Sequence, residues 1–157
     1  MDNALKLLVF ILDEHYYGIP LPSIIKILPS VEITPIPLSS DYILGVVNVH
    51  GDVIPALNIR KLLGLNQKAV SLFDYFVITE IYSKKIIFIV DSVQTITEYF
   101  TKELTSVDKF FSIKMDHVEG ILKKNENLIF LLNIEKIISE NDIQSLEKIS
   151  KIGGTIK

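Results

Sequence analysis

Short runs of aliphatic and aromatic residues alternate along the chain with short polar or Gly- and Pro-containing breaks. Runs of this length predict β-strands. The first run covers residues 5–12, and Asp13-Glu14-His15 turns it into a second run at residues 16–19. Ser23 is placed to N-cap a short helix that ends at Leu28.

Three further pairs of runs predict β-hairpins. They join residues 45–49 with 53–57, residues 75–82 with 86–90, and residues 118–122 with 128–132. The breaks between them are His50-Gly51-Asp52, Ser83-Lys84-Lys85 and a polar stretch around Asn125-Glu126-Asn127. Gly51 can adopt the positive φ that a tight turn needs. Residues 29–40 contain Pro29, Pro35 and Pro37, so we expect only an edge strand and a loop there.

Helical spacing of apolar residues appears near the C-terminus. Ile134, Ile137 and Ile138 form one stripe, and Ile143, Leu146 and Ile149 form another. This spacing predicts a C-terminal helix within residues 139–157, and the Gly153-Gly154 pair predicts a frayed tail.

An internal repeat is the most informative feature of the sequence. GVVNVHGDVIPALNIRKLL, residues 45–63, aligns without gaps over GILKKNENLIFLLNIEKII, residues 120–138. The two segments share a first glycine, Gly45 and Gly120, and a Leu-Asn-Ile ending that leads into a helical pattern. Residues 23–27 similarly resemble residues 92–96. The repeat predicts two similar small β-units in tandem, and short antiparallel strands avoid exposed edges best by closing into barrels.

Composition excludes several classes of function. Sixteen Lys and Arg against 19 Asp and Glu give a formal charge of -3, whereas nucleic-acid binding needs clustered positive charge. The basic pairs Arg60-Lys61, Lys84-Lys85 and Lys123-Lys124 are expected at solvated edges. Cysteine is absent, which excludes disulfides, thiolate nucleophiles and Cys-ligated metals. The apolar run at residues 7–12 is too short for a signal peptide or a membrane span, so we expect a cytoplasmic protein.

Candidate catalytic and metal-binding residues are few. His15, His50 and His117 lack the spacing of a metal site and are expected to be exposed turn histidines, so no metal and no cofactor is expected. Asp91 follows a strand and is expected to cap the next turn through nearby backbone amides. Gly45 and Gly120 are expected at places of close backbone packing. No nucleophile, base and orienting group stand together in a recognisable pattern, so we expect no enzyme activity.

The chain resembles the CheW family of chemotaxis coupling proteins from about Leu7 to Ile138. The segment YILGVVNVHGDVIP, from Tyr42 to Pro55, is similar to the family's Gly-Val-x-Asn-Leu-Arg-Gly-x-Ile-x-Pro core. Supporting segments are Ile19-Pro20-Leu21, Thr34-Pro35-Ile36-Pro37, and residues 88–93, 118–121 and 130–134.

The resemblance implies a mainly β fold of two intertwined SH3-like five-stranded β-barrels with short helices and a C-terminal helix. Residues 1–157 would form a single CheW-like domain. The first barrel would cover about residues 15–70, and the second would combine about residues 5–14 with 71–138. Residues 139–157 would form the C-terminal helix and tail.

By the same resemblance, the protein couples the cytoplasmic tip of chemoreceptors to the regulatory domain of a CheA-type histidine kinase, in arrays at the membrane. It would neither bind nucleic acid nor insert into the membrane. The groove between the barrels would take the receptor helix, and the kinase-binding residues stay unassigned. Carried over position by position, the receptor-facing residues are Ile24, Gly45, Asn48, His50 and Val90. The structural motif positions are Gly51, Pro55, Asp91 and Gly120.

Two positions depart from the family pattern. His50 replaces the arginine of the core motif, and Lys26 occupies a position where the family usually has a glutamate on the short helix. Imidazole lacks the planar, permanently charged fork of a guanidinium. We therefore predict a divergent partner surface. Alternatives are an SH3-like regulatory domain that binds a peptide or metabolite outside chemotaxis, and a truncated kinase regulatory domain.

Overall fold

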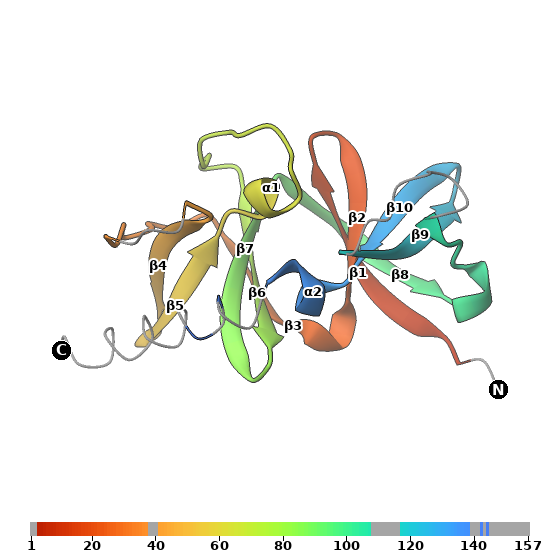
Figure 1. Cartoon of the computed structure of the whole chain (residues 1–157), viewed down its shortest axis with the longest axis horizontal. Coiled ribbons are helices and arrows are strands. Elements are labelled where there is room, and N and C mark those ends of the chain that lie inside the picture. The colour runs from red at the N-terminus through yellow and green to blue at the C-terminus, as the bar shows by residue number, and fades with distance from the viewer. Residues whose placement is uncertain (1–2, 38–40, 108–116, 139–141, 143, 145–157) are drawn as a thin grey trace.

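The computed structural model describes residues 3–37, 41–107, 117–138, 142 and 144, and within them ten strands form two five-stranded sheets (Figure 1). The first sheet has the order β3 (Ile24–Pro29), β6 (Tyr75–Ile81), β7 (Lys84–Val90), β5 (Asp52–Leu57) and β4 (Ile43–Val49). The second has the order β8 (Ser92–Tyr99), β1 (Leu5–Leu12), β2 (His15–Pro20), β10 (Asn127–Leu132) and β9 (Val118–Lys124). Short helical turns connect them: η1 (Leu21–Ser23), α1 (Ile59–Leu62), η2 (Thr101–Glu103) and α2 (Ile134–Ile137).

The two sheets have the same topology. In each, the successive strand pairs are antiparallel, antiparallel, parallel and antiparallel. In the first sheet the hairpin β6–β7 lies between β3 and β5. In the second sheet the equivalent position, between β8 and β10, is occupied by the hairpin β1–β2, which comes from the N-terminal end of the chain. The internal repeat is therefore real: β4, β5 and α1 correspond to β9, β10 and α2.

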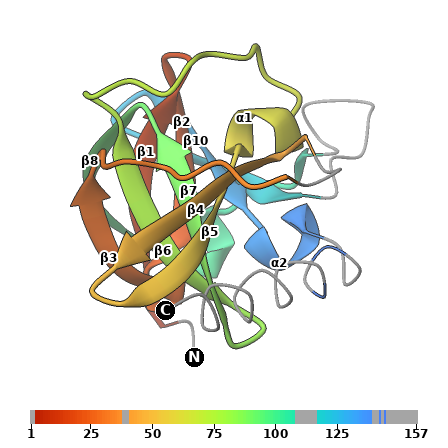
Figure 2. The ribbon, with the colours of Figure 1, turned by 90° about the vertical axis from the view of Figure 1, so that its left-hand side faces the viewer.

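Each sheet is closed by the segment that follows its edge strand. Thr34, beyond β3, exchanges two backbone hydrogen bonds with Val46 of β4, at 2.8 and 2.9 Å. Thr105, beyond β8, does the same with Ile121 of β9, at 2.9 and 2.8 Å. Both closures join the two edges of a sheet, so each sheet curls into a small barrel (Figure 2). The expected mainly β fold of two five-stranded barrels with short helices is confirmed.

The shared glycines are needed at these closures. A Cβ on Gly45 would lie 2.3 Å from the carbonyl oxygen of Thr34, and Gly45 has a φ of +152°. A Cβ on Gly120 would lie 2.9 Å from the carbonyl oxygen of Thr105. The same close backbone approach therefore explains why the repeat keeps a glycine in both halves, as expected for close packing.

The hydrophobic core has one part that both sheets share and two parts that each lie inside one sheet. The largest cluster joins Leu8 and Phe10 of β1 with Val77 of β6 and Phe88 of β7, and so lies between the sheets. The neighbouring residues Phe76 and Ile78 of β6 belong to a cluster inside the first sheet, and Leu7 and Val9 of β1 to one inside the second. These strands are thus buried on both faces, which is why their sequences read as continuous apolar runs without polar alternation.

The boundaries expected for the two barrels differ from the strand assignment. Residues 15–70 were expected in the first barrel, but β2 pairs with β1 and β10 in the second sheet. Residues 71–138 were expected in the second, but β6 and β7 pair with β3 and β5 in the first. The reason is the tight turn in each hairpin. A two-residue connection forces its two strands to be neighbours, so β1–β2 and β6–β7 each stay in one sheet.

The predicted helix from Ser23 to Leu28 is wrong. Ser23 ends η1 without a side-chain cap, and Ile24 begins β3. The segment carries Ile24, Ile25 and Ile27, whose branched side chains favour an extended strand. The corresponding residues 92–96 are likewise part of a strand, β8. The expected C-terminal helix and tail at residues 139–157 lie outside the described residues, apart from Asp142 and Gln144.

All four hairpin turns are shorter than predicted, three of them by one residue and the turn after β9 by more. The loops are Asp13-Glu14, His50-Gly51, Tyr82-Ser83 and Asn125-Glu126, and every one of these residues has a positive φ. Two-residue loops of this kind match the right-handed twist of the strands that they join. Seven of the eight turn residues are not glycine and still have a positive φ. The presence of a glycine therefore identified only one of the four turns, the one with Gly51.

Candidate functional site

The junction between the two barrels is built around a buried arginine on α1. Asn58 caps this short helix, its side chain accepting a hydrogen bond from the Lys61 amide at 3.2 Å, and Ile59 anchors it in the shared core. The next residue, Arg60, points into the junction, and its side chain is only 8% exposed. The expectation that Arg60-Lys61 is a solvated pair is therefore wrong for Arg60.

Arg60 binds carboxylates from both barrels. Its Nη2 donates to Asp91 Oδ1 and Oδ2 at 2.8 and 2.7 Å, and its Nη1 donates to Asp13 Oδ1 at 2.5 Å. Asp13 lies in the β1–β2 turn of the second sheet. Asp91 lies between β7 and β8, where the chain passes from the first sheet to the second. We call Arg60, Asp13 and Asp91 the ionic junction. A largely buried arginine that binds two carboxylates at once fixes geometry as well as charge.

Asp91 also fixes the backbone at this crossing. Its Oδ2 accepts a hydrogen bond from the Asp13 amide at 3.0 Å, and its own amide donates to the carbonyl of Ile11 at 3.0 Å. The expected cap on a nearby turn is therefore corrected: the amide that Asp91 binds belongs to a turn 78 residues away in the sequence.

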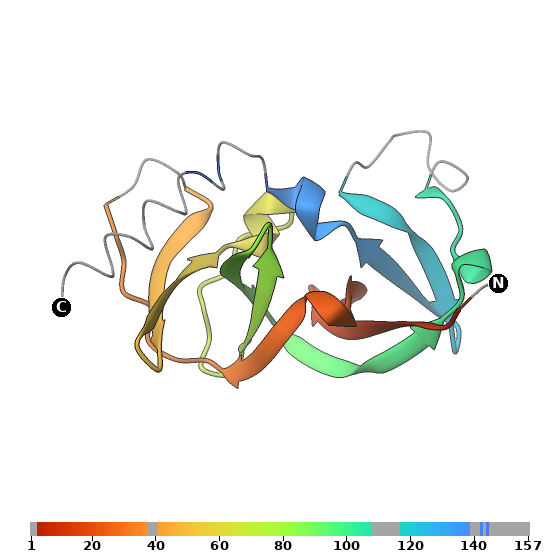
Figure 3. The same cartoon turned by 90° about the horizontal axis from the view of Figure 1, so that it is seen from below.

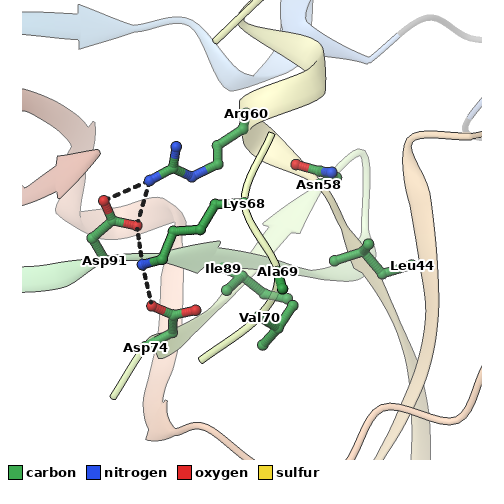
Figure 4. A pocket seen from close by; sticks show the side chains of 9 residues that line it. All are labelled: Leu44, Asn58, Arg60, Lys68, Ala69, Val70, Asp74, Ile89 and Asp91. Carbon is green, nitrogen blue, oxygen red and sulfur yellow. Dashed lines mark hydrogen bonds and ion pairs between the residues drawn. The ribbon is translucent and has the colours of Figure 1, made fainter. Parts of the chain in front are cut away.

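Lys68 extends the ionic junction into the loop between α1 and β6 (Figure 4). Its Nζ lies 3.6 Å from Asp91 Oδ1 and 3.4 Å from Asp74 Oδ1. The cavity enclosed beside these residues measures about 20 Å³. Because such a volume holds about one water molecule, the ionic junction is a structural element and not a ligand pocket.

The ionic junction makes stability depend on pH. Burial alone would raise the pKa of Asp91, but the hydrogen bonds from Arg60 and from the Asp13 amide, with the positive charges of Arg60 and Lys68, lower it below its ordinary value. A carboxyl with a depressed pKa in the folded state stabilises the fold above its unfolded pKa, which is about 3.9. That contribution is lost as the pH falls through the folded-state pKa.

We therefore expect the free energy of unfolding, measured by urea denaturation, to fall below about pH 4 more steeply in the wild type than in Asp91→Asn. Asp41→Asn is the matched control, because Asp41 has a lowered pKa through Lys61 but is exposed. The free energy of unfolding of Asp41→Asn should fall with decreasing pH almost as that of the wild type does. Equal profiles for wild type and Asp91→Asn would contradict the role of Asp91.

The predicted receptor-facing residues are not brought together on one surface. Asn48 and His50 lie at the exposed tip of the β4–β5 hairpin, where Asn48 Oδ1 accepts a hydrogen bond from the Gly51 amide at 2.9 Å. Ile24 begins β3, at the other edge of the same sheet, and is half-buried. Gly45 is buried under Thr34, and Val90 is 0% exposed in the shared core.

Lys26 and His50, the two departures from the family pattern, are also separated. Lys26 pairs with Ile78 on edge strand β3, whereas His50 is the first residue of the turn beyond edge strand β4. Both side chains are exposed. The motif residues Gly51 and Pro55 lie in the same β4–β5 hairpin, with Gly51 at a φ of +93° and Pro55 in β5 opposite Val46.

A groove runs between the barrels beside α1. Leu63 and Leu65 from the loop after α1 line one side, and Tyr17 and Phe130 of the second sheet line the other, around a volume of about 320 Å³. The ring of Tyr17 packs against Phe10 and Phe130, with centroids 6.0 and 5.8 Å apart. Burial and the nearby carboxylate of Asp13 raise the pKa of Tyr17, so its hydroxyl stays neutral.

Two of the three histidines line this groove. His15 follows the β1–β2 turn, and its Nδ1 lies 2.7 Å from the carbonyl oxygen of Asp13. His117 precedes β9 and lines the same groove, whereas His50 lies in the first barrel. Among the described residues no group of three or more His, Cys, Asp or Glu side chains is placed to hold a metal ion.

Two features of the structure were not found from the sequence. The first is the ionic junction, whose residues are far apart in the chain. The second is the loop between α1 and β6, where Leu72 and Phe73 are 88% and 86% exposed. The sequence gives no signal for this exposure, because the loop also contains the apolar residues Leu63, Leu65 and Val70. In the described part of the chain, no helix is long and apolar enough to span a membrane.

Comparisons with known proteins agree with this architecture. The model of the CheW-like domain matches residues 6–142. Chemotaxis protein CheW of Thermotoga maritima is 30% identical over 148 residues, which cover 89% of this chain and 93% of that protein. Chemotaxis protein CheW of Treponema pallidum is 24% identical over 150 residues, 92% and 88% of the two chains. The crystal structure of the scaffolding protein TtCheW from Thermoanaerobacter tengcongensis, 26% identical, superposes with a TM-score of 0.79 over 89% of this chain and 96% of that one.

Proposed function

The chain belongs to the CheW-like domain family, and on that basis we propose that it is a chemotaxis scaffold that couples chemoreceptors to a CheA-type histidine kinase. The observation that carries the proposal is the match over residues 6–142, together with the two SH3-like barrels shared with the scaffolding protein TtCheW. Relatives named chemotaxis protein CheW match nearly the whole chain.

The arrangement of the barrels suits a scaffold. The shared core and the ionic junction hold both barrels in one body, so a partner bound to one barrel keeps a defined position relative to a partner bound to the other. Such a role needs complementary surfaces and no bond chemistry, and we propose that the protein is not an enzyme. It would act in the cytoplasm, recruited to receptor arrays at the membrane.

For the receptor we propose two separate contact regions on the first barrel, the tip of the β4–β5 hairpin and strand β3. Asn48, His50, Ile24 and Lys26 offer side chains to a partner there. Gly45 and Val90 would support these regions from inside and not touch the partner, because Gly45 is covered by Thr34 and Val90 is fully buried. Interfaces in signalling assemblies of this kind are often small and individually weak.

Calorimetric titration with the kinase regulatory domain and with a receptor-tip fragment from the same organism tests the proposal. We expect saturable binding to both, each with 1:1 stoichiometry. Binding to only one partner would contradict coupling. Binding to neither would overturn the proposed function in favour of the alternative, a regulatory domain for a peptide or metabolite.

The double variant Lys26→Glu/His50→Arg tests the receptor surface in the same titrations. It restores the charge pair usual in the family, so we expect receptor affinity to change by about tenfold or more, as charge-pair changes at interfaces do. The matched control is Thr95→Glu/Asn125→Arg, which introduces the same two residues, a glutamate and an arginine, at the corresponding positions of the second barrel. Asn125 has a φ of 49°, almost equal to the 51° of His50, so the turn strain is the same. Equal effects of both doubles would rule out a specific surface at Lys26 and His50.

A further inference from the structure

A lysine in the loop between α1 and β6 bridges two carboxylates that belong to different parts of the molecule. The loop rises at the top of Figure 1, and Lys68 lies in its first half. The Nζ of Lys68 lies 3.6 Å from Asp91 Oδ1, at the crossing between the barrels, and 3.4 Å from Asp74 Oδ1, where the loop returns to β6 (Figure 4). Because one positive charge attracts both carboxylates, Lys68 links the returning half of the loop to the ionic junction.

Asp74 depends on this lysine. Its side chain is only 6% exposed, and among the described residues Lys68 is the one cation that forms an ion pair with it. The other carboxylate oxygen of Asp74, Oδ2, accepts a hydrogen bond from the Ser71 amide at 2.7 Å. A buried carboxylate without a positive partner is unfavourable. If Lys68 lost its charge, Asp74 would therefore turn toward water and release the Ser71 amide.

The backbone of Asp74 holds the end of strand β3. Its carbonyl oxygen accepts a hydrogen bond at 3.1 Å from the amide of Ser30, which directly follows Pro29, the last residue of β3. β3 leaves η1 between the two barrels and runs along the outside of the first one (Figure 3). Further along the same segment, Thr34 closes the first barrel on Val46 of β4. The segment held by Asp74 thus connects the two proposed receptor regions, β3 and the β4–β5 hairpin.

The first half of the loop is anchored by other contacts. Arg60 Nη1 donates to the carbonyl of Asn66 at 2.9 Å, and the Asn58 side chain donates to Gln67 Oε1 at 2.6 Å. These bonds attach the backbone just before Lys68 to helix α1 and its cap. The lysine side chain therefore extends from a fixed base, and its contact with the carboxylate near β6 joins this fixed half to the returning half of the loop.

The other end of the same set of contacts lies in the second barrel. Asp91 Oδ2 accepts a hydrogen bond from the Asp13 amide at 3.0 Å, and Asp13 belongs to the β1–β2 turn. Contacts are therefore continuous from the Asp13 amide through Asp91, Lys68 and Asp74 to the Ser30 amide. The two amides mark the ends of this chain of contacts, one in each barrel, and each can be followed by hydrogen exchange.

We propose that Lys68 is a positioning residue that couples the end of β3 to the ionic junction. With both carboxylates bound to Lys68, the Ser30 amide stays on the Asp74 carbonyl, and β3 keeps a fixed position relative to the second barrel. Loss of either carboxylate contact releases the returning half of the loop and the end of β3 together. A consequence, which rests on the proposed function, is that a receptor bound at β3 alters the hydrogen bond of the Asp13 amide in the second barrel.

Amide hydrogen exchange of the full chain, measured by NMR, tests this role. Lys68→Met should speed exchange at the Ser30 and Ser71 amides about fivefold or more, as expected for couplings between charges in contact. Lys68→Arg, which keeps the charge, should stay close to the wild type. The matched control is Lys85→Met, because Lys85 is similarly exposed, 49% against 45%, and pairs with Asp52 at 2.8 Å. It should leave both amides unchanged, and equal effects of Lys68→Met and Lys85→Met would overturn the proposal.

A double-mutant cycle separates coupling from a local effect. The Ser30 and Ser71 amides do not bind Asp91 directly, so Asp91→Asn should speed their exchange only through Lys68. We therefore expect an acceleration in the wild-type background and almost none in Lys68→Met. The Ile121 amide, at the closure of the second barrel, reports any general loss of stability and serves as the reference. Additive effects of the two substitutions, relative to this reference, would overturn the proposal.

The receptor-tip fragment tests the consequence for the proposed function. On saturation, exchange at the Asp13 amide should change about twofold or more in the wild type and stay constant in Lys68→Met. A fragment that binds but leaves Asp13 unchanged in the wild type would overturn the coupling to the second barrel. A fragment that does not bind would overturn the proposed function, while the double-mutant cycle would still decide the role of Lys68.

Discussion

Arg60→Met is expected to lower the free energy of unfolding by about 3 kcal/mol, because the carboxylates of Asp13 and Asp91 lose the guanidinium that binds both, and only Lys68, 3.6 Å from Asp91, remains. The side chains of Asp13 and Asp91 are 35% and 24% exposed, so water partly solvates the carboxylates that lose their partner. The expected loss of stability is therefore at the lower end of the range for breaking a buried ion pair. Urea denaturation at neutral pH, followed by circular dichroism, measures it.

The neighbouring residue provides the control. Lys61 pairs with Asp41 at 2.8 Å, but their side chains are 43% and 72% exposed. Exposed pairs of this kind contribute about 0–1 kcal/mol, so Lys61→Met should leave the unfolding midpoint almost unchanged. In the double variant Arg60→Met/Asp91→Asn, part of the lost stability should return, since one unpaired charge is removed. Similar losses for Arg60→Met and Lys61→Met would show that the ionic junction contributes no more than a surface pair.

Gly45→Ala is expected to lower the free energy of unfolding by about 3 kcal/mol or more, through a backbone clash. The added Cβ would lie 2.3 Å from the Thr34 carbonyl oxygen and 2.8 Å from its carbon, and no side chain can move aside to make room. The positive φ of 152° adds strain for any residue with a Cβ. To fold, the variant must move the 31–37 segment away from β4 and open the closure of the first barrel.

Gly51→Ala separates the clash from the strain. Gly51 also has a positive φ, +93°, but its added Cβ would meet nothing within 4 Å. Its substitution should cost about 1 kcal/mol, from the backbone alone. Hydrogen exchange at the amides of Thr34 and Val46 should speed up in Gly45→Ala and stay slow in Gly51→Ala. Equal losses of stability in the two variants would contradict the close-approach argument.

Much of the fold was predictable from the sequence because it depends on local patterns. The apolar runs placed the strands of all four hairpins, and the repeat at residues 45–63 and 120–138 identified two equivalent barrels. Errors arose where a local pattern was ambiguous. Residues 24–28 follow a serine suited to capping a helix, Ser23, but carry branched side chains, and pairing with β6 made them a strand. The turn residues Tyr82, Ser83 and Glu126 gave no signal, since only the twist of the paired strands imposes their positive φ.

The candidate site was less predictable than the fold. The motif from Tyr42 to Pro55 led to the family, and the family model confirmed it. The individual site residues are separated in the structure: Asn48 and His50 are exposed, whereas Val90 is fully buried. Whether they serve the receptor stays a prediction.

The sequence by itself determined the secondary structure of the hairpins, the twofold repeat and the family, because these depend on spacing along the chain and on motifs that survive divergence. Only the tertiary structure decided which hairpin completes which barrel. A strand buried on both faces is a continuous apolar run, and its sequence does not indicate which strand it pairs with. It also decided that Arg60 meets Asp13 and Asp91, 47 and 31 residues away. Charge pairing at such separations depends on how the barrels pack. The exposure of Leu72 and Phe73 was decided in the same way, because burial belongs to the assembled surface and not to the residue type.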